Sequence, residues 1–288
     1  MSVFGCEGNK MVDNENTALI HPTAVISKKA KLGQGVEVGP YTVIDGVVSV
    51  GEGTVIGAHC VIIGNTAIGK NCRIYTGAVV GAPPQDLKYK GERSFLIIGD
   101  NNTIREYSTI NPGTGDGGST IIGDNNLFMA NAHIAHDCVI GNQCVLVNAA
   151  TLAGHVAVED KVLISGLTAV HQFVRIGKLA IVGGCTKVVQ DIPPFSTCDG
   201  HPARIYGLNL IGLKRNNIPR DTIDRLKHAY KVIFRSGMTI KNALNQIEQE
   251  GQSDKEVAHL IDFLKQKSSR GVSRFNRSAR SENEDPGI

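Results

Sequence analysis

Four histidines and a neighbouring carboxylate are the strongest sign of chemistry in the sequence. His133 and His136 lie three residues apart, His155 and His171 follow, and Asp137 precedes His155 by 18 residues. Imidazoles gathered in one place repel one another when charged, so such a group needs a reason to be neutral together. Two kinds of site meet that need. One is a metal held by three neutral imidazoles, and the other is a general base among polar groups that position a substrate.

A strict six-residue repeat sets the positions of these histidines. From Ile20 to Val188, all but four of the 29 positions at this spacing carry Ile, Leu or Val. The exceptions are Asp86, Glu92, Asp116 and Phe128. Neither a helix nor simple strand alternation has this period. The period is typical of a short strand and a sharp turn, with three units in one triangular coil of 18 residues and stacked coils in a parallel β-helix.

Such a coil places residues 18 apart one above the other, at a spacing of about 4.8 Å. One predicted column contains His136, Gly154 and Gln172, and the next contains Asp137 and His155. His171 lies in the column on the other side, and His133 is three residues from His136. The sequence therefore predicts four histidines on one edge of the prism, over three successive coils.

The repeat also divides the chain into segments. Residues 1–17 form a polar leader, and residues 18–192 form the predicted β-helix domain. Two polar stretches, 81–97 and 111–121, are expected to leave the prism as loops. The second contains a G-x-G-x-x-G match at Gly113, but no helical pattern follows it, which favours a flexible loop over a dinucleotide site.

A different pattern follows the repeat. Ile223, Leu226, Tyr230 and Ile233 recur at helical spacing, which predicts a linker and a small helical domain over residues 193–267. Residues 268–288 have few apolar side chains, and we expect this tail to be disordered.

Composition excludes several classes of protein. The net charge of +3 is far from that of a dedicated nucleic-acid binder, and no apolar run approaches the ~18 to 20 residues of a membrane-spanning helix. The first residues contain no apolar signal core, so we expect a cytoplasmic protein without stable membrane insertion. Seven cysteines without a C-x-x-C pair argue against disulfides and structural zinc. Four of them share one position in the repeat and are expected to be buried thiols: Cys60, Cys72, Cys138 and Cys144.

Five segments in order carry a resemblance to a known family. They are QDLKYKGE, NAHIAHDCVIGN, ATLAGH, TAVHQF and GLNLIGLKR. Together they resemble the UDP-N-acetylglucosamine acyltransferases, the first enzymes of lipid A synthesis, over about residues 20–271. The resemblance implies a left-handed parallel β-helix followed by a small α-helical domain. It also implies a cytoplasmic homotrimer without a cofactor, which moves an (R)-3-hydroxyacyl group from acyl carrier protein to the 3-hydroxyl of UDP-N-acetylglucosamine.

The resemblance also implies roles for individual residues. His136 would be the general base, Asp137 would support its imidazole, and the N–H of Gly154 would stabilise the thioester oxyanion. Substrate-binding positions would be Asp86, Lys88, His133, His155, His171, Gln172, Asn209 and Arg215. Gly184 would limit the length of the acyl chain, with glycine leaving the groove open for chains of about 12 to 14 carbons.

The sequence departs from the family pattern at two nucleotide positions. Ile211 stands where relatives can carry a carboxylate, and Asn216 where a second arginine can occur. Neither position is therefore assigned a contact with the uridine.

Other functions remain compatible with the repeat. The acceptor could be the 3-amino analogue of the UDP-sugar, and a zinc enzyme of the γ-carbonic anhydrase type is also a β-helix with three histidine ligands. The related N-acyltransferase of the same pathway needs a nucleotide-binding domain before its β-helix, which 17 polar residues cannot form. A purely structural solenoid would need no histidines stacked on one edge.

Overall fold

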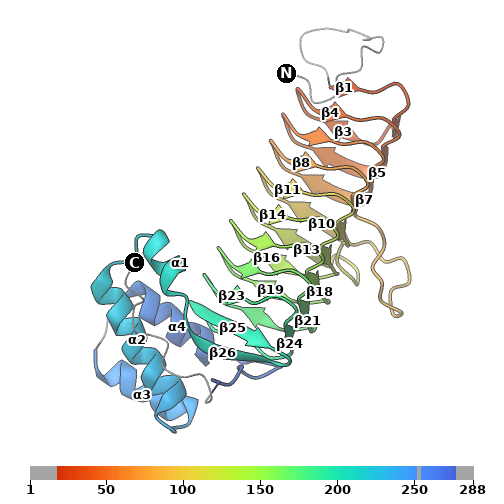
Figure 1. The fold of residues 1–288 in the computed structure, drawn as a ribbon. Helices are drawn as coiled ribbons and strands as arrows, with labels where there is room; N and C mark the ends of the chain where they lie inside the picture. Colours follow the sequence, from red (N-terminus) through yellow and green to blue (C-terminus); the bar gives the residue numbers. More distant parts are fainter. Residues whose placement is uncertain (1–17, 252–253, 277–288) are drawn as a thin grey trace.

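The computed structural model describes residues 18–251 and 254–276, and in it the repeat forms a three-sided prism with helices at its C-terminal end (Figure 1). Each face is a ladder of short parallel strands, and residues 18 apart pair between consecutive uninterrupted coils. The fold class predicted from the repeat is confirmed. The predicted leader, residues 1–17, lies outside the described residues.

The first face continues into a hairpin at the C-terminal end. It consists of β1 (Leu19–Ile20), β4 (Glu37–Val38), β6 (Val55–Ile56), β8 (Arg73–Ile74), β11 (Thr103–Ile104), β14 (Leu127–Phe128), β17 (Val145–Leu146), β20 (Leu163–Ile164), β23 (Ile181–Val182), β25 (Ser196–Gly200) and β26 (Ala203–Leu208).

The second and third faces are joined by two longer strands that turn the corner, β5 (Val43–Val50) and β7 (Val61–Ile68). The second face adds β2 (Val25–Ile26), β9 (Val79–Val80), β12 (Thr109–Ile110), β15 (His133–Ile134), β18 (Thr151–Leu152), β21 (Ala169–Val170) and β24 (Lys187–Val188). The third face adds β3 (Lys31–Leu32), β10 (Phe95–Ile98), β13 (Ser119–Ile122), β16 (Val139–Ile140), β19 (Ala157–Val158) and β22 (Arg175–Ile176).

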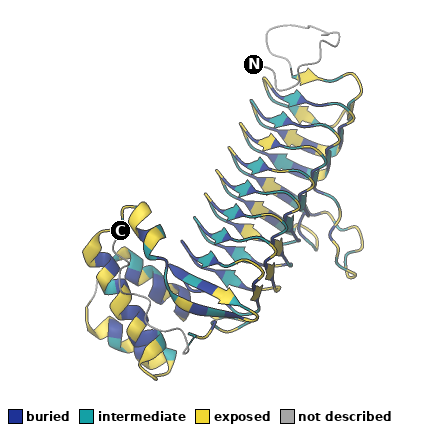
Figure 2. Cartoon of the chain, in the orientation of Figure 1, coloured by how far each residue is buried: buried dark blue, intermediate teal, exposed yellow. Residues whose placement is uncertain are grey.

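The repeat aliphatics fill the inside of the prism. From Val38 to Val188, every repeat position that carries Ile, Leu, Val or Phe is at most 4% exposed, and Figure 2 shows this buried interior beyond the first coil. The four repeat cysteines are fully buried, as predicted. Burial raises the pKa of Cys138 to about 12 and that of Cys144 to about 11, so both thiols stay protonated at neutral pH.

Many corners of the prism require a left-handed backbone. The third residue after the core aliphatic has a positive φ in coil after coil, for example 57° at Asp137, 59° at His155 and 65° at Phe173. Such angles favour glycine or asparagine, yet many of these corners carry larger side chains. The hydrogen-bonded ladders on both sides of each corner therefore hold the backbone in this conformation.

Both predicted interruptions leave the prism at the same edge, between the second and third faces. The first runs from β9 to β10 and the second from β12 to β13. The second is less free than predicted, because Gly113 N–H donates to the Phe95 carbonyl at 3.1 Å and Gly117 N–H to the Arg93 carbonyl at 2.8 Å.

The C-terminal domain contains α1 (Leu210–Arg215), α2 (Arg220–Arg235), α3 (Ile240–Gln249) and α4 (Lys255–Lys265). The four residues at helical spacing are buried in α2, as predicted. Part of the predicted disordered tail is ordered instead, because residues 268–276 return to the domain. There Val272 pairs with Asp191, and Phe275 pairs with Ile205 and packs on the helical core. Residues 277–288 lie outside the described residues.

Candidate active site

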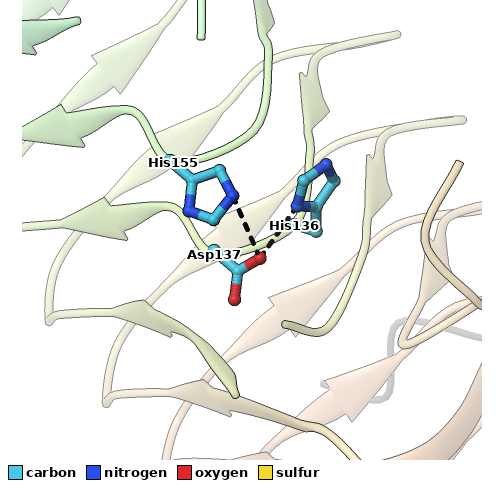
Figure 3. Close-up of side chains that lie close together, drawn as sticks. All are labelled: His136, Asp137 and His155. Carbon is cyan, nitrogen blue, oxygen red and sulfur yellow. Dashed lines mark hydrogen bonds and ion pairs between the residues drawn. The ribbon is translucent and has the colours of Figure 1, made fainter. Parts of the chain in front are cut away.

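The prism brings His136 and Asp137 to the corner between β15 and β16. Nδ1 of His136 lies 2.8 Å from Oδ2 of Asp137, and both side chains are 14% exposed (Figure 3). A carboxylate at Nδ1 favours the tautomer with the proton on that nitrogen. Nε2 is then the unprotonated nitrogen, which is the one a general base uses.

Asp137 is itself held by a residue of the preceding coil. Thr114, in the second loop, donates its N–H to Oδ1 at 3.0 Å and its hydroxyl to Oδ2 at 2.5 Å. Burial tends to raise the pKa of Asp137, but the hydrogen bonds from Thr114 and His136 outweigh it and hold the pKa below its usual value. The carboxylate therefore stays ionised at neutral pH.

A second imidazole approaches the same carboxylate from the next coil along the chain. Nε2 of His155 lies 3.6 Å from Oδ2 of Asp137, as the 18-residue column predicts (Figure 3). The rings of His155 and His136 meet edge to face, with centroids 5.2 Å apart. The other side of the His155 ring stacks on the ring of Phe173, with centroids 4.6 Å apart. Phe173 belongs to the same 18-residue column and was not predicted as a site residue.

Gly154 lies over the ring of His136. A Cβ built on Gly154 would stand 2.4 Å from Cε1 and 2.6 Å from Nε2 of His136, so only glycine leaves room for this ring. Among the described residues, the N–H of Gly154 has no hydrogen-bond acceptor. A free backbone donor therefore lies beside the basic nitrogen.

The third histidine lies on β15, the strand that leads into this corner. His133, on β15, shares a 2.7 Å hydrogen bond between its Nδ1 and the hydroxyl of Thr109, its ladder partner on β12. Burial lowers the pKa of His133, and so does the charge that His136 carries when it is protonated. Its ring is therefore neutral at neutral pH and available for hydrogen bonding to a substrate.

His171 and Gln172 continue the same edge one coil above Gly154. Both side chains are exposed, and Nδ1 of His171 lies 3.2 Å from the backbone carbonyl of Gln172. The predicted clustering of four histidines on one edge is thus what the prism produces.

The first loop leaves from this same edge, two coils before that of His136 in the chain. At its outer part, Lys88 N–H donates to Oδ1 of Asp86 at 2.9 Å, and the Leu87 side chain between them is fully exposed. Asn111 fastens the base of the loop by donating to the Ala82 carbonyl at 3.0 Å. Within the described chain, neither Asp86 nor Lys88 bonds to the histidine cluster.

The remaining predicted positions lie away from this edge. Asn209 caps α1, with Oδ1 accepting from Gly212 N–H at 2.8 Å and Nδ2 donating to the Leu179 carbonyl at 2.9 Å. Arg215 is exposed at the end of α1. Gly184 lies at the edge between the first and second faces, where an added Cβ would meet only the Gly166 carbonyl oxygen, at 3.5 Å.

The cluster could also hold a metal by proximity. The ligand atoms of His136, Asp137 and His155 lie within 4.8 Å of one another. The zinc alternative, however, calls for three imidazoles, and this group contains two. Its carboxylate is already hydrogen-bonded to His136 and Thr114. The arrangement therefore suits a base and its orienting carboxylate better than the three-histidine site.

Comparisons with known proteins identify the family of the chain. The family model for UDP N-acetylglucosamine O-acyltransferase, domain 2, matches residues 191–273, and that for bacterial transferase hexapeptide repeats matches residues 119–154. The chain is similar to the acyl-[acyl-carrier-protein]–UDP-N-acetylglucosamine O-acyltransferase of Aliarcobacter butzleri, with 51% identity over 90% of this chain and 98% of the relative. The corresponding protein of Anaeromyxobacter dehalogenans strain 2CP-1 is 47% identical, covering 88% and 99%.

Solved structures give the same result. The UDP-N-acetylglucosamine acyltransferase of Francisella novicida superposes with a TM-score of 0.86 at 37% identity, covering 92% of this chain and 99% of that one. That of Bacteroides fragilis also gives 0.86, at 40% identity over 89% and 100%. The chain therefore belongs to the UDP-N-acetylglucosamine O-acyltransferase family of hexapeptide-repeat proteins.

Proposed function

We propose that this protein transfers an (R)-3-hydroxyacyl group from acyl carrier protein to the 3-hydroxyl of UDP-N-acetylglucosamine. One observation carries the proposal: the basic nitrogen of a carboxylate-oriented histidine lies beside a free backbone N–H, on the edge where two loops leave the prism. Relatives about 50% identical over most of the chain are acyl-[acyl-carrier-protein]–UDP-N-acetylglucosamine O-acyltransferases, which supports this class of reaction.

Each group in the cluster has a step in this reaction. Nε2 of His136 takes the proton from the sugar hydroxyl while the oxygen attacks the thioester carbon. The N–H of Gly154 donates to the oxyanion that forms on the thioester carbonyl. Collapse of the tetrahedral intermediate breaks the carbon–sulfur bond, and the imidazolium returns its proton to the leaving thiol of the carrier. Asp137 stabilises the imidazolium between these two proton transfers.

The polar groups around the base would hold the substrates. His133, His155, His171 and Gln172 present ring nitrogens or an amide along the open edge above and below the base. Asp86 and Lys88 would reach the sugar-phosphate region from a neighbouring copy, because neither bonds to the cluster in its own chain. Arg215 offers an exposed cation for the nucleotide.

The assignment of Asn209 needs revision within this scheme. Its amide oxygen caps α1 and its amide nitrogen binds the Leu179 carbonyl, and the residue is only 6% exposed. We therefore assign Asn209 to positioning α1, which carries Arg215, and leave the direct nucleotide contact to that arginine.

The proposed assembly is a homotrimer. Its three active sites lie between neighbouring prisms. If the second face of each copy is turned toward the three-fold axis, the histidine edge of one copy meets the Gly184 edge of the next. The outward side chains in the N-terminal part of the second face suit such burial, because they are all valines: Val25, Val43, Val61 and Val79. This arrangement would bring Gly184 within reach of an acyl chain attached near His136.

The described residues contain no helix with both the length and the apolar character needed to cross a membrane. We propose a cytoplasmic location, because both substrates are themselves soluble.

An acyl-transfer assay tests the proposed function directly. Purified protein is mixed with acyl carrier proteins that carry 3-hydroxyacyl chains of several lengths, together with UDP-N-acetylglucosamine or its 3-amino analogue. Ester formation on the first sugar supports the proposal, and turnover of the amino sugar alone would replace the acceptor. Near-stoichiometric zinc in active protein would favour the carbonic-anhydrase alternative, and absence of UDP-sugar binding by calorimetry would favour a structural solenoid.

A further inference from the structure

Thr114 connects the second loop to the corner that carries His136 and Asp137. It is a residue of the glycine-rich loop between β12 and β13, and the 18-residue columns do not place it near any histidine. Its N–H nevertheless donates to both carboxylate oxygens of Asp137, at 3.0 Å to Oδ1 and 3.2 Å to Oδ2, and its hydroxyl donates to Oδ2 at 2.5 Å. Two donors on two oxygens fix the rotation of the carboxylate as well as its place.

The loop is built to hold Thr114 still. Gly113 and Gly117 are hydrogen-bonded to the chain just before and at the start of β10. A Cβ on Gly113 would stand 2.2 Å from the Ser119 nitrogen, and one on Gly118 would stand 1.8 Å from the Thr114 carbonyl oxygen. Glycine at these two positions therefore allows a tight fold that a larger residue would open.

The rotation of this carboxylate matters because two imidazoles compete for it. Oδ2 of Asp137 lies 2.8 Å from Nδ1 of His136 and 3.6 Å from Nε2 of His155. A carboxylate turned toward His155 would no longer hold the proton of His136 on Nδ1. The tautomer with an unprotonated Nε2 would then no longer be stabilised, and His136 would lose its function as a base.

We propose that Thr114 is a positioning residue, whose hydroxyl keeps the Asp137 carboxylate on His136 and away from His155. The inference rests on the proposed function only in its kinetic consequence. The contact itself, and its effect on the chemical reactivity of His136, require no substrate.

The main test compares three variants of the full-length protein in the acyl-transfer assay. Thr114→Val removes the hydroxyl but keeps the shape and the backbone N–H, and should lower kcat by about 10- to 100-fold, the usual effect of losing a hydrogen bond to a charged group. KM for the UDP-sugar should change less than about threefold. Thr114→Ser restores the hydroxyl and should recover most of the activity.

Thr54→Val is the matched control for loss of a buried hydroxyl. Thr54 lies near the N-terminal end of the prism, where its hydroxyl donates to the Gly69 carbonyl at 2.9 Å. This variant should keep the parental kcat even if its melting temperature falls. If Thr114→Val and Thr54→Val lose activity equally, or if Thr114→Val raises only KM, the positioning role is wrong.

A double substitution tests the competition between the two imidazoles. In a His155→Phe background the competing ring nitrogen is gone, so the fold-loss caused by Thr114→Val should shrink at least severalfold. Equal fold-losses in the two backgrounds would show that Thr114 does not act by keeping the carboxylate from His155.

Labelling without substrate separates this inference from the proposed function. Diethyl pyrocarbonate modifies neutral imidazoles, and peptide mapping gives the rate at each histidine. Thr114→Val should slow modification of His136 severalfold and leave exposed His59 unchanged. If the parent protein transfers no acyl group but this difference appears, the proposed function fails and the inference stands; an unchanged rate at His136 overturns the inference.

Discussion

The backbone of Gly154 and the ring of His136 lie so close that a methyl group cannot stand between them. A Cβ on Gly154 would be 2.6 Å from Nε2 of His136. We expect Gly154→Ala to displace the imidazole and lower kcat at least about 100-fold, because both base and oxyanion donor lose their geometry. Steady-state kinetics measure this loss, and circular dichroism checks the fold. An active Gly154→Ala variant would show that the ring occupies another position during catalysis.

His136→Ala should abolish transfer while the prism stays folded. The side chain lies at a corner and contributes little to the core, whereas a positioned imidazole adds roughly 10²- to 10⁴-fold to the rate. His171→Ala is the comparison, since its exposed ring should affect KM more than kcat. Residual activity of His136→Ala above a few per cent of the parent would exclude it as the sole base.

Activity should fall with acid through the titration of a histidine. The hydrogen bonds to Asp137 keep the pKa of this carboxylate below its usual value, so it remains ionised well below neutral pH. An imidazole base, and not the Asp137 carboxylate, should therefore set the acid limb of kcat/KM. A profile that stays flat down to pH ~5 would point to a carboxylate base.

The stability of the protein should also depend on His133. Its pKa in the folded chain is lowered by burial and by the charge of His136, so the unfolded chain binds more protons between that value and about 6.5. The stabilising contribution is complete above pH ~6.5 and is lost as the pH falls through this window.

His133→Asn can keep a hydrogen bond to Thr109 but cannot gain a proton. The melting temperature of this variant should decline less than that of the parent between pH 7 and pH 5. The control is His59→Asn, at an exposed left-handed corner where asparagine is readily accepted. If both variants follow the parental pH dependence, burial of His133 does not contribute.

Gly184→Met should shorten the acyl chain that the enzyme prefers. The backbone does not require glycine there, because φ is not in the left-handed region and an added Cβ meets only one atom, at 3.5 Å. Each methylene excluded from a groove costs about 0.8 kcal/mol, so one or two blocked methylenes change the preference by about 4- to 15-fold. Competition between acyl carriers of different lengths measures the shift, and Gly184→Ala should produce a smaller one. An unchanged length profile would make the glycine irrelevant to specificity.

The residues inside the uninterrupted repeat could be placed from the sequence, because the coil converts residue number into position. The 18-residue column correctly brought His155 to Asp137 and Gly154 to His136. It also contains Phe173, whose stacking on His155 follows from the same count.

The contacts made by interruptions could not be placed in this way. Thr114 lies in a loop whose path depends on its own glycines and on hydrogen bonds to β10, so no period connects it to Asp137. The capping role of Asn209 depends on how α1 meets Leu179 at the C-terminal end of the prism. Val272 and Phe275 form too sparse a pattern to predict that residues 268–276 return to the domain.

The single edge shared by the loops and the histidines has a consequence for how such a protein can evolve. From Val80 to Ile98 the chain takes 18 residues to pass a corner that needs six elsewhere, and from Ile110 to Ile122 it takes 12, yet the strands on both sides keep their partners. Insertions at this edge are thus tolerated by the ladders beneath them. A lineage could therefore lengthen or exchange one loop, and acquire a new acceptor, without rebuilding any other coil.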